Sequence, residues 1–250
     1  MRKVAYKTKA EMGAAVARMA IVEISTALDR ASAASVILAT GASQFETLDG
    51  LANSQAVDWS RVTMFHLDEY IGLGESHRAG FRRYLKERFA DRVGTLKAAH
   101  FVNGNAPDAS AECRRLGELI RMNPVDVALV GIGENGHLAF NDPPADFDTE
   151  DPYLVVELDE ACRAQQLGEG WFETIEDVPH RAISMSIRQI MKSRVILVSV
   201  PDERKARAVA DALEGPLSNT VPASVLQQHP CCTVFMDVPA ASLLAEYEKE

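Results

Sequence analysis

Long apolar runs are missing from this sequence. No stretch approaches the ~18 consecutive apolar residues of a transmembrane helix. The N-terminal segment MRKVAYKTKAEMGAAV also lacks the continuous apolar stretch and the small-residue cleavage site of a signal peptide. These absences predict a cytoplasmic protein that does not associate with membranes.

Basic clusters and metal-binding cysteine patterns are missing as well. The formal net charge is −10 and no basic run occurs. Nucleic acid is therefore disfavoured as a main partner, because binding to a phosphate backbone requires a cationic stripe. The four cysteines form neither a CxxC pair nor the spaced Cys/His quartet of zinc sites, so we expect no metal. A few cations and backbone amides can still bind a small phosphate in an acidic protein.

The chain has 250 residues, of which 47% are hydrophobic, a size and composition that suit one α/β domain. Short apolar runs predict strands at Ser35–Thr40, Val62–Leu67, Val125–Ile132, Tyr153–Leu158, Ala182–Met185, Arg194–Val200 and Cys232–Met236. Helices are predicted at Lys9–Arg30, Gln44–Asn53, Phe81–Phe89 and Ala109–Met122, and from an Asp202 cap to Leu213. The alternation of strands and helices predicts a single domain over residues 1–250. Its fold should be a doubly wound, largely parallel sheet with helices on both faces, similar to the Rossmann fold.

Ligands of open parallel sheets bind beyond the carboxyl ends of the strands, and the polar residues of interest lie there. TGASQ (Thr40–Gln44) is a turn of small residues between a strand and a helix. Its backbone amides, with the Ser43 hydroxyl, can hold a phosphate. An ordinary tight turn between a strand and a helix has the same sequence pattern. The pattern alone therefore does not distinguish a phosphate-binding loop from an ordinary turn.

Asp68 and Glu69 follow the next strand, in FHLDEYIGL. Adjacent carboxylates project in different directions. One can therefore face a pocket as a general base while the other supports the loop. A pair of acids that only caps the next turn is the alternative.

GIGENGHLAFNDPP (Gly131–Pro144) is the most specific segment. His137 follows Gly136 directly, and an imidazole can transfer protons near neutral pH. Asn135 and Asp142 flank this histidine and could orient its ring. The cations Arg163 and Lys205 complete the candidate set, although a solvated surface position would explain either of them equally well.

These segments together resemble the glucosamine-6-phosphate deaminase family, within the wider group that also contains 6-phosphogluconolactonases. The resemblance covers nearly the whole chain, to ALEGPLSNTVPASVLQQHP near its end. Its strongest pieces are LDEY followed by IGL, GHLAFNDP, and LEG with the preceding Lys205.

The resemblance implies a role for each candidate residue. Asp68 matches the base that removes the C2 proton of the sugar, and His137 matches the residue that assists ring opening. Asp142 stands where the family usually has a glutamate that partners this histidine. The substrate's phosphate contacts would be Thr40, Gly41, Ser43, Arg163 and Lys205. The implied partner is a phosphorylated amino sugar and the implied chemistry is acid/base catalysis, so we expect no cofactor. Homo-oligomerisation stays open.

The sequence departs from the family pattern in four places. Asn135 occupies a position that is aspartate in some members, and Asp142 is one methylene shorter than the usual glutamate. Gln44 replaces a proline that is common in the phosphate loop. The acidic segment Asp146–Pro152 replaces basic residues that bind an effector in allosteric hexameric members, which argues against that effector site here.

Two other functions fit parts of this sequence. A 6-phosphogluconolactonase would need only His137 to activate water, but lactonases typically read DER and ASLFP where this chain has DEY and AFNDP. A non-catalytic sugar-phosphate sensor would share the fold, but no helix-turn-helix segment is present and a complete acid/base set would be surplus. The gluco and galacto epimers of the amino sugar are not distinguished by the sequence.

Overall fold

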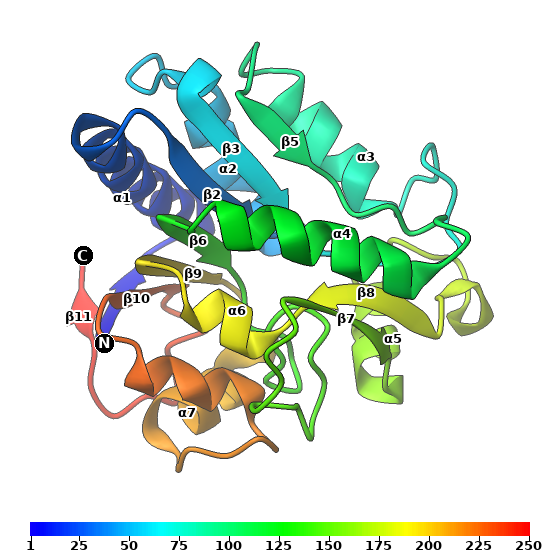
Figure 1. Cartoon of the computed structure of the whole chain (residues 1–250). Helices are drawn as coiled ribbons and strands as arrows, with labels where there is room; N and C mark the ends of the chain where they lie inside the picture. Colours follow the sequence, from blue (N-terminus) through cyan, green and yellow to red (C-terminus); the bar gives the residue numbers. More distant parts are fainter.

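The computed structural model describes residues 1–250. Its main feature is an eight-stranded sheet with helices on both faces (Figure 1). The strand order is β11-β1-β10-β9-β6-β2-β3-β5, and every pairing is parallel. The strands are β1 (Arg2–Tyr6), β2 (Ala34–Leu38), β3 (Val62–His66), β5 (Ala98–His100), β6 (Val127–Val130), β9 (Val195–Val200), β10 (Cys232–Asp237) and β11 (Glu248–Lys249). The predicted α/β class with a parallel sheet is confirmed.

The central strands are buried on both faces, which explains why their sequences are nearly all apolar. On β2, Ile37 packs into one core cluster, whereas Val36 and Leu38 pack into another. The clusters lie on opposite faces of the sheet because successive side chains of a strand point to opposite sides.

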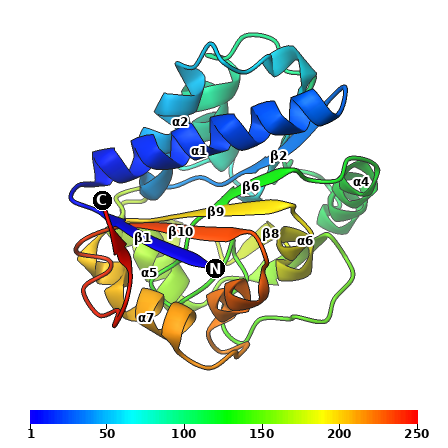
Figure 2. The same cartoon turned by 90° about the vertical axis from the view of Figure 1, so that its left-hand side faces the viewer.

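The helices are α1 (Lys9–Arg30), α2 (Phe45–Ala52), α3 (Phe81–Leu85), α4 (Ala109–Met122), α5 (Glu160–Gly168), α6 (Ile187–Met191) and α7 (Ala206–Glu214). Short helical turns are η1 (Ala42–Gln44), η2 (Trp59–Arg61), η3 (Lys86–Ala90), η4 (Ile175–Asp177), η5 (Glu203–Lys205) and η6 (Pro222–Gln228). Figure 2 shows α1 and α2 on one side of the sheet and α7 on the other. None of the helices combines the length and the apolarity of a membrane span.

A second, smaller sheet was not predicted from the sequence. It has three antiparallel strands in the order β4-β8-β7. They are β4 (Asp68–Tyr70), β7 (Tyr153–Glu157) and β8 (Arg181–Met185). The predicted strands at 153–158 and 182–185 therefore exist, but they are not part of the parallel sheet. Asp68 and Glu69, expected at a strand's end, instead begin this second sheet.

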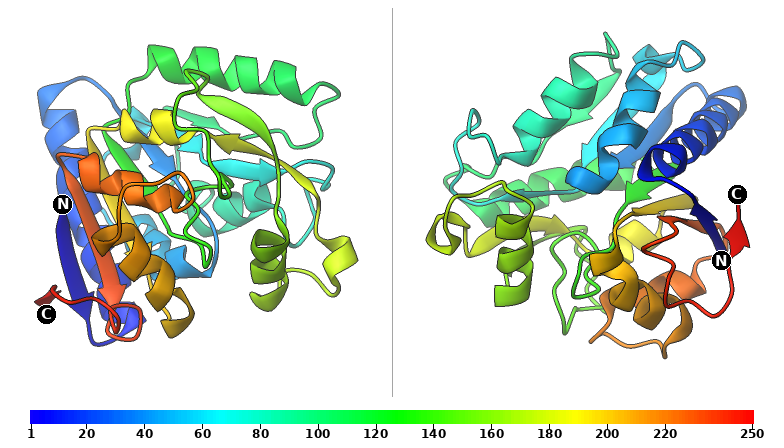
Figure 3. Two further views of the ribbon diagram at one scale, coloured as in Figure 1. Left: turned by 90° about the horizontal axis from the view of Figure 1, so that it is seen from below. Right: turned by 180° about the vertical axis from the view of Figure 1, so that it is seen from behind.

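The N-terminal strand β1 was also missed, because RKVAY carries two cations in five residues and gives no apolar run. It pairs with both β10 and β11, and β11 comes from the other end of the chain. In both views of Figure 3 the two termini therefore lie together at one edge of the molecule, away from α5.

The strand order locates the binding edge of the main sheet. From β2 the chain proceeds outward through β3 to β5, and from β6 it proceeds in the opposite direction through β9 to β10. The order therefore reverses between β2 and β6, which are neighbours. Loops diverge at such a switch point and leave a crevice at the carboxyl ends of the strands, where ligands of open α/β sheets bind.

Candidate active site

A cleft of about 500 Å³, its open mouth included, lies at this switch point. The lining comes from the ends of β2, β3, β6 and β9 and from α3 and α5, and its polar members are Thr40, Ser43, Asp68, His137, Gln165, Gln166, Glu169 and Lys205. Six of the predicted site residues therefore meet in one cleft: Thr40, Gly41, Ser43, Asp68, His137 and Lys205.

The loop after β2 has a backbone conformation that requires glycine at position 41. Gly41 has a φ of 91°, a conformation that side-chain-bearing residues rarely adopt. Its carbonyl oxygen accepts a hydrogen bond from the Tyr84 hydroxyl at 2.9 Å. Gln44, which replaces the family's proline, donates through Nε2 to the carbonyl of Val130 at 3.4 Å and to Ser43 Oγ at 3.2 Å. The glutamine thus links this loop to β6.

Lys205 is the one lysine or arginine among the residues that line the cleft. It ends η5, just after β9, and its Nζ donates to the carbonyl of Ile132 at 3.0 Å. Burial lowers the pKa of the Lys205 ammonium, while the charges of Glu169 and Glu134 oppose that change. The direct partner of this buried ammonium in the protein is a backbone carbonyl and not a carboxylate, so it could still pair with an anion in the cleft.

Asp68 and Glu69 divide into a cleft residue and a support residue. Glu69 accepts backbone hydrogen bonds from Tyr70, Phe81 and Arg82, and so fastens the first turn of α3. Asp68 faces the cleft, and its Oδ1 is buried without a hydrogen-bond partner. Burial and then the charge of Glu69 raise the pKa of Asp68 to about 8. Burial also raises the pKa of Glu69, to about 7, although its three amide donors oppose the rise.

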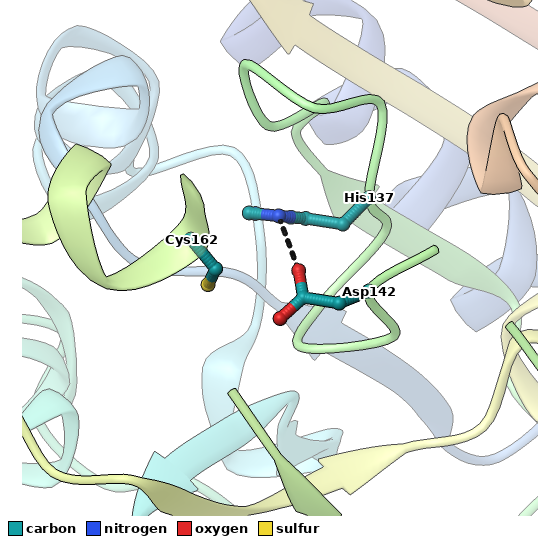
Figure 4. A group of neighbouring side chains, drawn as sticks. All are labelled: His137, Asp142 and Cys162. Carbon is teal, nitrogen blue, oxygen red and sulfur yellow. Dashed lines mark ion pairs between the residues drawn. The ribbon is translucent and has the colours of Figure 1, made fainter. Parts of the chain in front are cut away.

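His137 and Asp142 form a buried histidine–carboxylate pair. Nδ1 of His137 lies 3.0 Å from Oδ1 of Asp142, and the two side chains are 9% and 7% exposed. Aspartate therefore reaches the imidazole despite its missing methylene. Figure 4 shows the carboxylate out of the plane of the ring. This explains why Nδ1 has no hydrogen bond of good angle although the separation is short.

Asn135 does not orient the imidazole ring, contrary to the expectation from its place in the sequence. Its Nδ2 donates to Asp142 at 3.0 Å and to Asp159 at 3.1 Å, and its Oδ1 accepts from the backbone amide of His137. Burial alone would raise the pKa of Asp142, but His137, Asn135 and the amide of Asp159 lower it below the usual value. Asn135 thus acts on the carboxylate and not directly on the imidazole.

Two glycines of this loop are required by its geometry. A Cβ on Gly133 would lie 2.2 Å from Nε2 of His137, so the ring packs directly against the glycine backbone. Gly136 has a φ of 82°, a conformation that favours glycine, and its carbonyl accepts from the amide of Ala223. The backbone at Gly133 therefore packs against the tip of the imidazole ring, at Nε2, Cε1 and Cδ2.

Cys162, on α5, lies next to the His137–Asp142 pair (Figure 4). One ligand-type atom from each of the three residues lies within 4.8 Å of the others. Both oxygens of Asp142 already accept hydrogen bonds, from Asn135 and from the amide of Asp159. Burial and the carboxylates of Asp142 and Asp159 raise the pKa of the Cys162 thiol. The three residues are neighbours with a protonated thiol rather than a prepared metal site, because metal ligation requires the thiolate.

Arg163 does not lie with the other predicted phosphate contacts. Its guanidinium donates to the carbonyls of Ile175 and Val178, and the residue is absent from the cleft lining. The prediction that it contacts phosphate is therefore not supported. Arg163 instead joins α5 to η4, with its donors satisfied inside the protein.

Sequence reasoning missed the contribution of α5 to the cleft. Gln165, Gln166 and Glu169 line it, and the Oε2 of Glu169 lies 3.8 Å from the position of a Cβ on Gly41. The Glu169 carboxylate accepts from Gln165 Nε2 and from Trp171 Nε1. No sequence motif identifies these residues as part of the cleft. They lie on or just after α5, which connects β7 and β8 of the second sheet, and that sheet was not predicted.

A buried carboxyl, a histidine–carboxylate pair, a buried lysine and a glycine-containing turn at a switch point define a class of site. It suits proton transfer on a small anionic substrate. A family model described as glucosamine-6-phosphate isomerases/6-phosphogluconolactonase matches residues 7–235. The chain belongs to this family.

Named relatives are similar over most of the chain. A glucosamine-6-phosphate deaminase of an Exiguobacterium species is 43% identical over 191 residues, 76% of this chain and 73% of the relative. One of Bacillus thuringiensis is 39% identical over 209 residues, 84% of this chain and 78% of the relative. The solved structure of a monomeric glucosamine-6-phosphate deaminase superposes with a TM-score of 0.86 at 33% identity, covering 97% of this chain and 100% of that one. A 6-phosphogluconolactonase of Thermotoga maritima has a TM-score of 0.78 at 16% identity, with 95% and 99% covered, which shows the shared fold.

The raised pKa of Asp68 predicts how stability depends on pH. The folded state keeps the Asp68 proton up to about pH 8, whereas the unfolded state loses it at about pH 4. The free energy of unfolding should therefore decrease as the pH rises through this window. Asp68→Asn should make that decrease shallower, as measured by urea unfolding at about pH 5 and about pH 8. The exposed Asp91→Asn is the matched control, and equal slopes in wild type and Asp68→Asn would contradict the burial argument.

Proposed function

We propose that this protein converts glucosamine 6-phosphate to fructose 6-phosphate and ammonia, by aldose–ketose isomerisation coupled to deamination, in the catabolism of amino sugars. The observation that carries the proposal is the meeting of Asp68, His137 and the Thr40–Ser43 loop in one cleft. These groups supply a base, a proton-transfer group for ring opening and an anion anchor. The names of the relatives at about 40% identity support the same reaction.

The phosphate of the substrate would bind to the amides of Gly41 and its neighbours, to the Ser43 hydroxyl and to Lys205. Held there, the sugar presents its reacting end toward His137 and Asp68. His137 moves a proton between the ring oxygen and the C1 hydroxyl, which opens the ring to an aldehyde. Asp142 holds the imidazole for this step.

The aldehyde at C1 acidifies the C2 hydrogen. Asp68 accepts this proton, and the electron pair forms a C1–C2 enolamine. Reprotonation at C1 gives an imine at C2, and water adds to the imine and releases ammonia. An ammonium on C2 would lie near Asp68 and favour its carboxylate form, which counters the effect of burial.

The proposal is tested by assaying one preparation for ammonia release from glucosamine 6-phosphate and for hydrolysis of 6-phosphogluconolactone. Ammonia release with little lactone hydrolysis is the expected result. Lactone hydrolysis without ammonia release would overturn the proposal in favour of the lactonase activity. Galactosamine 6-phosphate in a third arm distinguishes the two epimers.

Asp68→Asn should abolish exchange of the C2 hydrogen with solvent deuterium while substrate binding changes little, because the variant keeps the shape and loses the proton acceptor. The expected loss is on the order of ~10² or more, as for a positioned general base. Exchange is followed by NMR of the substrate and binding by calorimetry. Exchange at the wild-type rate would exclude Asp68 as the base.

The pKa of Asp68 also predicts the pH profile. The pH dependence of kcat/KM reports the ionisation of groups in the free enzyme. The value of kcat/KM should therefore rise with pH, and the midpoint of this ascending limb should lie near the Asp68 pKa of about 8. The corresponding limb of kcat should lie at lower pH, because the ammonium of the bound substrate favours the carboxylate. Glu69→Gln should move the kcat/KM limb to lower pH, since the Glu69 charge raises the pKa of Asp68. A limb that stays in place in Glu69→Gln would assign it to another group.

Lys205 and Glu169 carry opposite charges and both line the cleft with the proposed phosphate loop. Removing one charge or the other should change the KM for the phosphorylated substrate in opposite directions. Lys205→Ala should raise KM for the phosphorylated substrate roughly ten- to a hundredfold, since a charged hydrogen bond contributes about 1.5–3 kcal/mol. Glu169→Gln should lower KM, because its carboxylate lies beside Gly41 and would repel a phosphate there. Steady-state kinetics with glucosamine 6-phosphate and free glucosamine provide the comparison. Effects of equal size on both substrates would place the phosphate elsewhere.

A further inference from the structure

The turn between β7 and α5 carries an acid that touches the His137–Asp142 pair from outside the cleft. Asp159 is the N-cap of α5, and its Oδ1 accepts from the amide of Cys162 at 2.6 Å. Its own backbone amide donates to Oδ2 of Asp142 at 3.0 Å. Its second carboxylate oxygen accepts from Nδ2 of Asn135 at 3.1 Å. Asp159 does not line the cleft.

These contacts form a bridge of carboxylate, amide and carboxylate. The two N–H groups of the Asn135 amide lie between the carboxylates of Asp142 and Asp159 and donate one hydrogen bond to each. Each carboxylate therefore faces a hydrogen-bond donor and does not face the negative charge of the other carboxylate. The Asn135 oxygen accepts from the backbone of His137 and keeps the amide in this orientation. Asp142 therefore has a fixed donor on each oxygen, in addition to the imidazole.

We propose that Asp159 is a positioning residue for this reaction. Through its backbone amide and through Asn135 it holds the Asp142 carboxylate against His137, so that the imidazole is fixed for ring opening. The inference rests on the proposed function for its kinetic consequence, but the bridge itself is independent of which substrate binds. It also explains why asparagine suits position 135: an aspartate there would add a third carboxylate between two others, which strongly disfavours ionisation of all three.

The test separates the bridge from the helix cap. Asp159→Ser keeps a capping oxygen for α5 but lacks a second oxygen for Asn135. We expect kcat to fall roughly tenfold with KM within about twofold, as for removal of a group that orients a reacting residue. Asp108→Ser is the matched control, because Asp108 caps α4 in the same way through the amide of Ala111 and has no contact with the site. Thermal midpoints of both variants verify that each is folded.

A spectroscopic measurement tests the bridge without any substrate. In protein labelled with ¹⁵N in its histidines, the Nδ1 resonance of His137, assigned by its loss in His137→Gln, should shift in Asp159→Ser and not in Asp108→Ser. If ammonia release fails in the wild type but this shift occurs, the proposed function is wrong and the bridge is correct. An unchanged resonance together with unchanged kcat would overturn the inference.

A double variant gives the sharpest comparison. Asn135→Asp should lose more activity than Asp159→Ser, because it places like charges at 3.0 and 3.1 Å. Adding Asp159→Asn should restore part of that loss, since the asparagine can donate to the new carboxylate. Such recovery is a coupling between the two positions. Strictly additive losses would show that residues 135 and 159 act independently and would contradict the bridge.

Discussion

Burial acts on Asp68 and Asp142 in the same direction, and the hydrogen-bond donors around each carboxylate decide the outcome. Asp68 has an oxygen without a partner and the charge of Glu69 beside it, so its pKa rises. Asp142 has the Asn135 amide and the Asp159 backbone amide as donors and the imidazole of His137 beside it, so its pKa falls. One site thus contains a carboxyl that can take and release a proton near neutral pH and another that stays charged to hold the imidazole. When the surroundings of two carboxyl groups separate their pKa values in this way, the two groups can take different roles in one site.

The parallel sheet could be predicted from the sequence because its strands are buried on both faces. Runs such as Val127–Val130 and Val195–Val200 are nearly all apolar, and they end in the turns that build the cleft. The second sheet could not be assigned in this way. Tyr153–Glu157 is only partly buried, and its pairing with Arg181–Met185 joins segments separated by α5 and η4. A strand's presence is a local property of the sequence, but its partner is not.

The candidate site was predictable where the polar residue directly follows a parallel strand. Thr40, Asp68 and His137 satisfy this condition closely enough to be found, and the structure brings them together. Arg163 and Glu169 do not, because both lie on or just after α5, whose position depends on the second sheet. Arg163 donates to backbone carbonyls, whereas Glu169, for which the sequence predicted no role, lies beside Gly41.

The second sheet also supports both Asp68 and the segment after His137, and β8 is the strand that does so. Asp68 pairs with Ser184 on this strand, so the backbone of Asp68 is fixed by a β-ladder. The hydroxyl of the same Ser184 accepts from the amide of Phe140 at 3.0 Å, in the segment that follows His137. Asn141 adds a hydrogen bond from its side chain to the carbonyl of Met185 at 2.8 Å. Two groups of the site are thus held by neighbouring residues of one strand. A proton-transfer site loses rate steeply when its groups are misplaced by an ångström. In the proposed reaction, this shared support on β8 would keep Asp68 and His137 at a fixed separation.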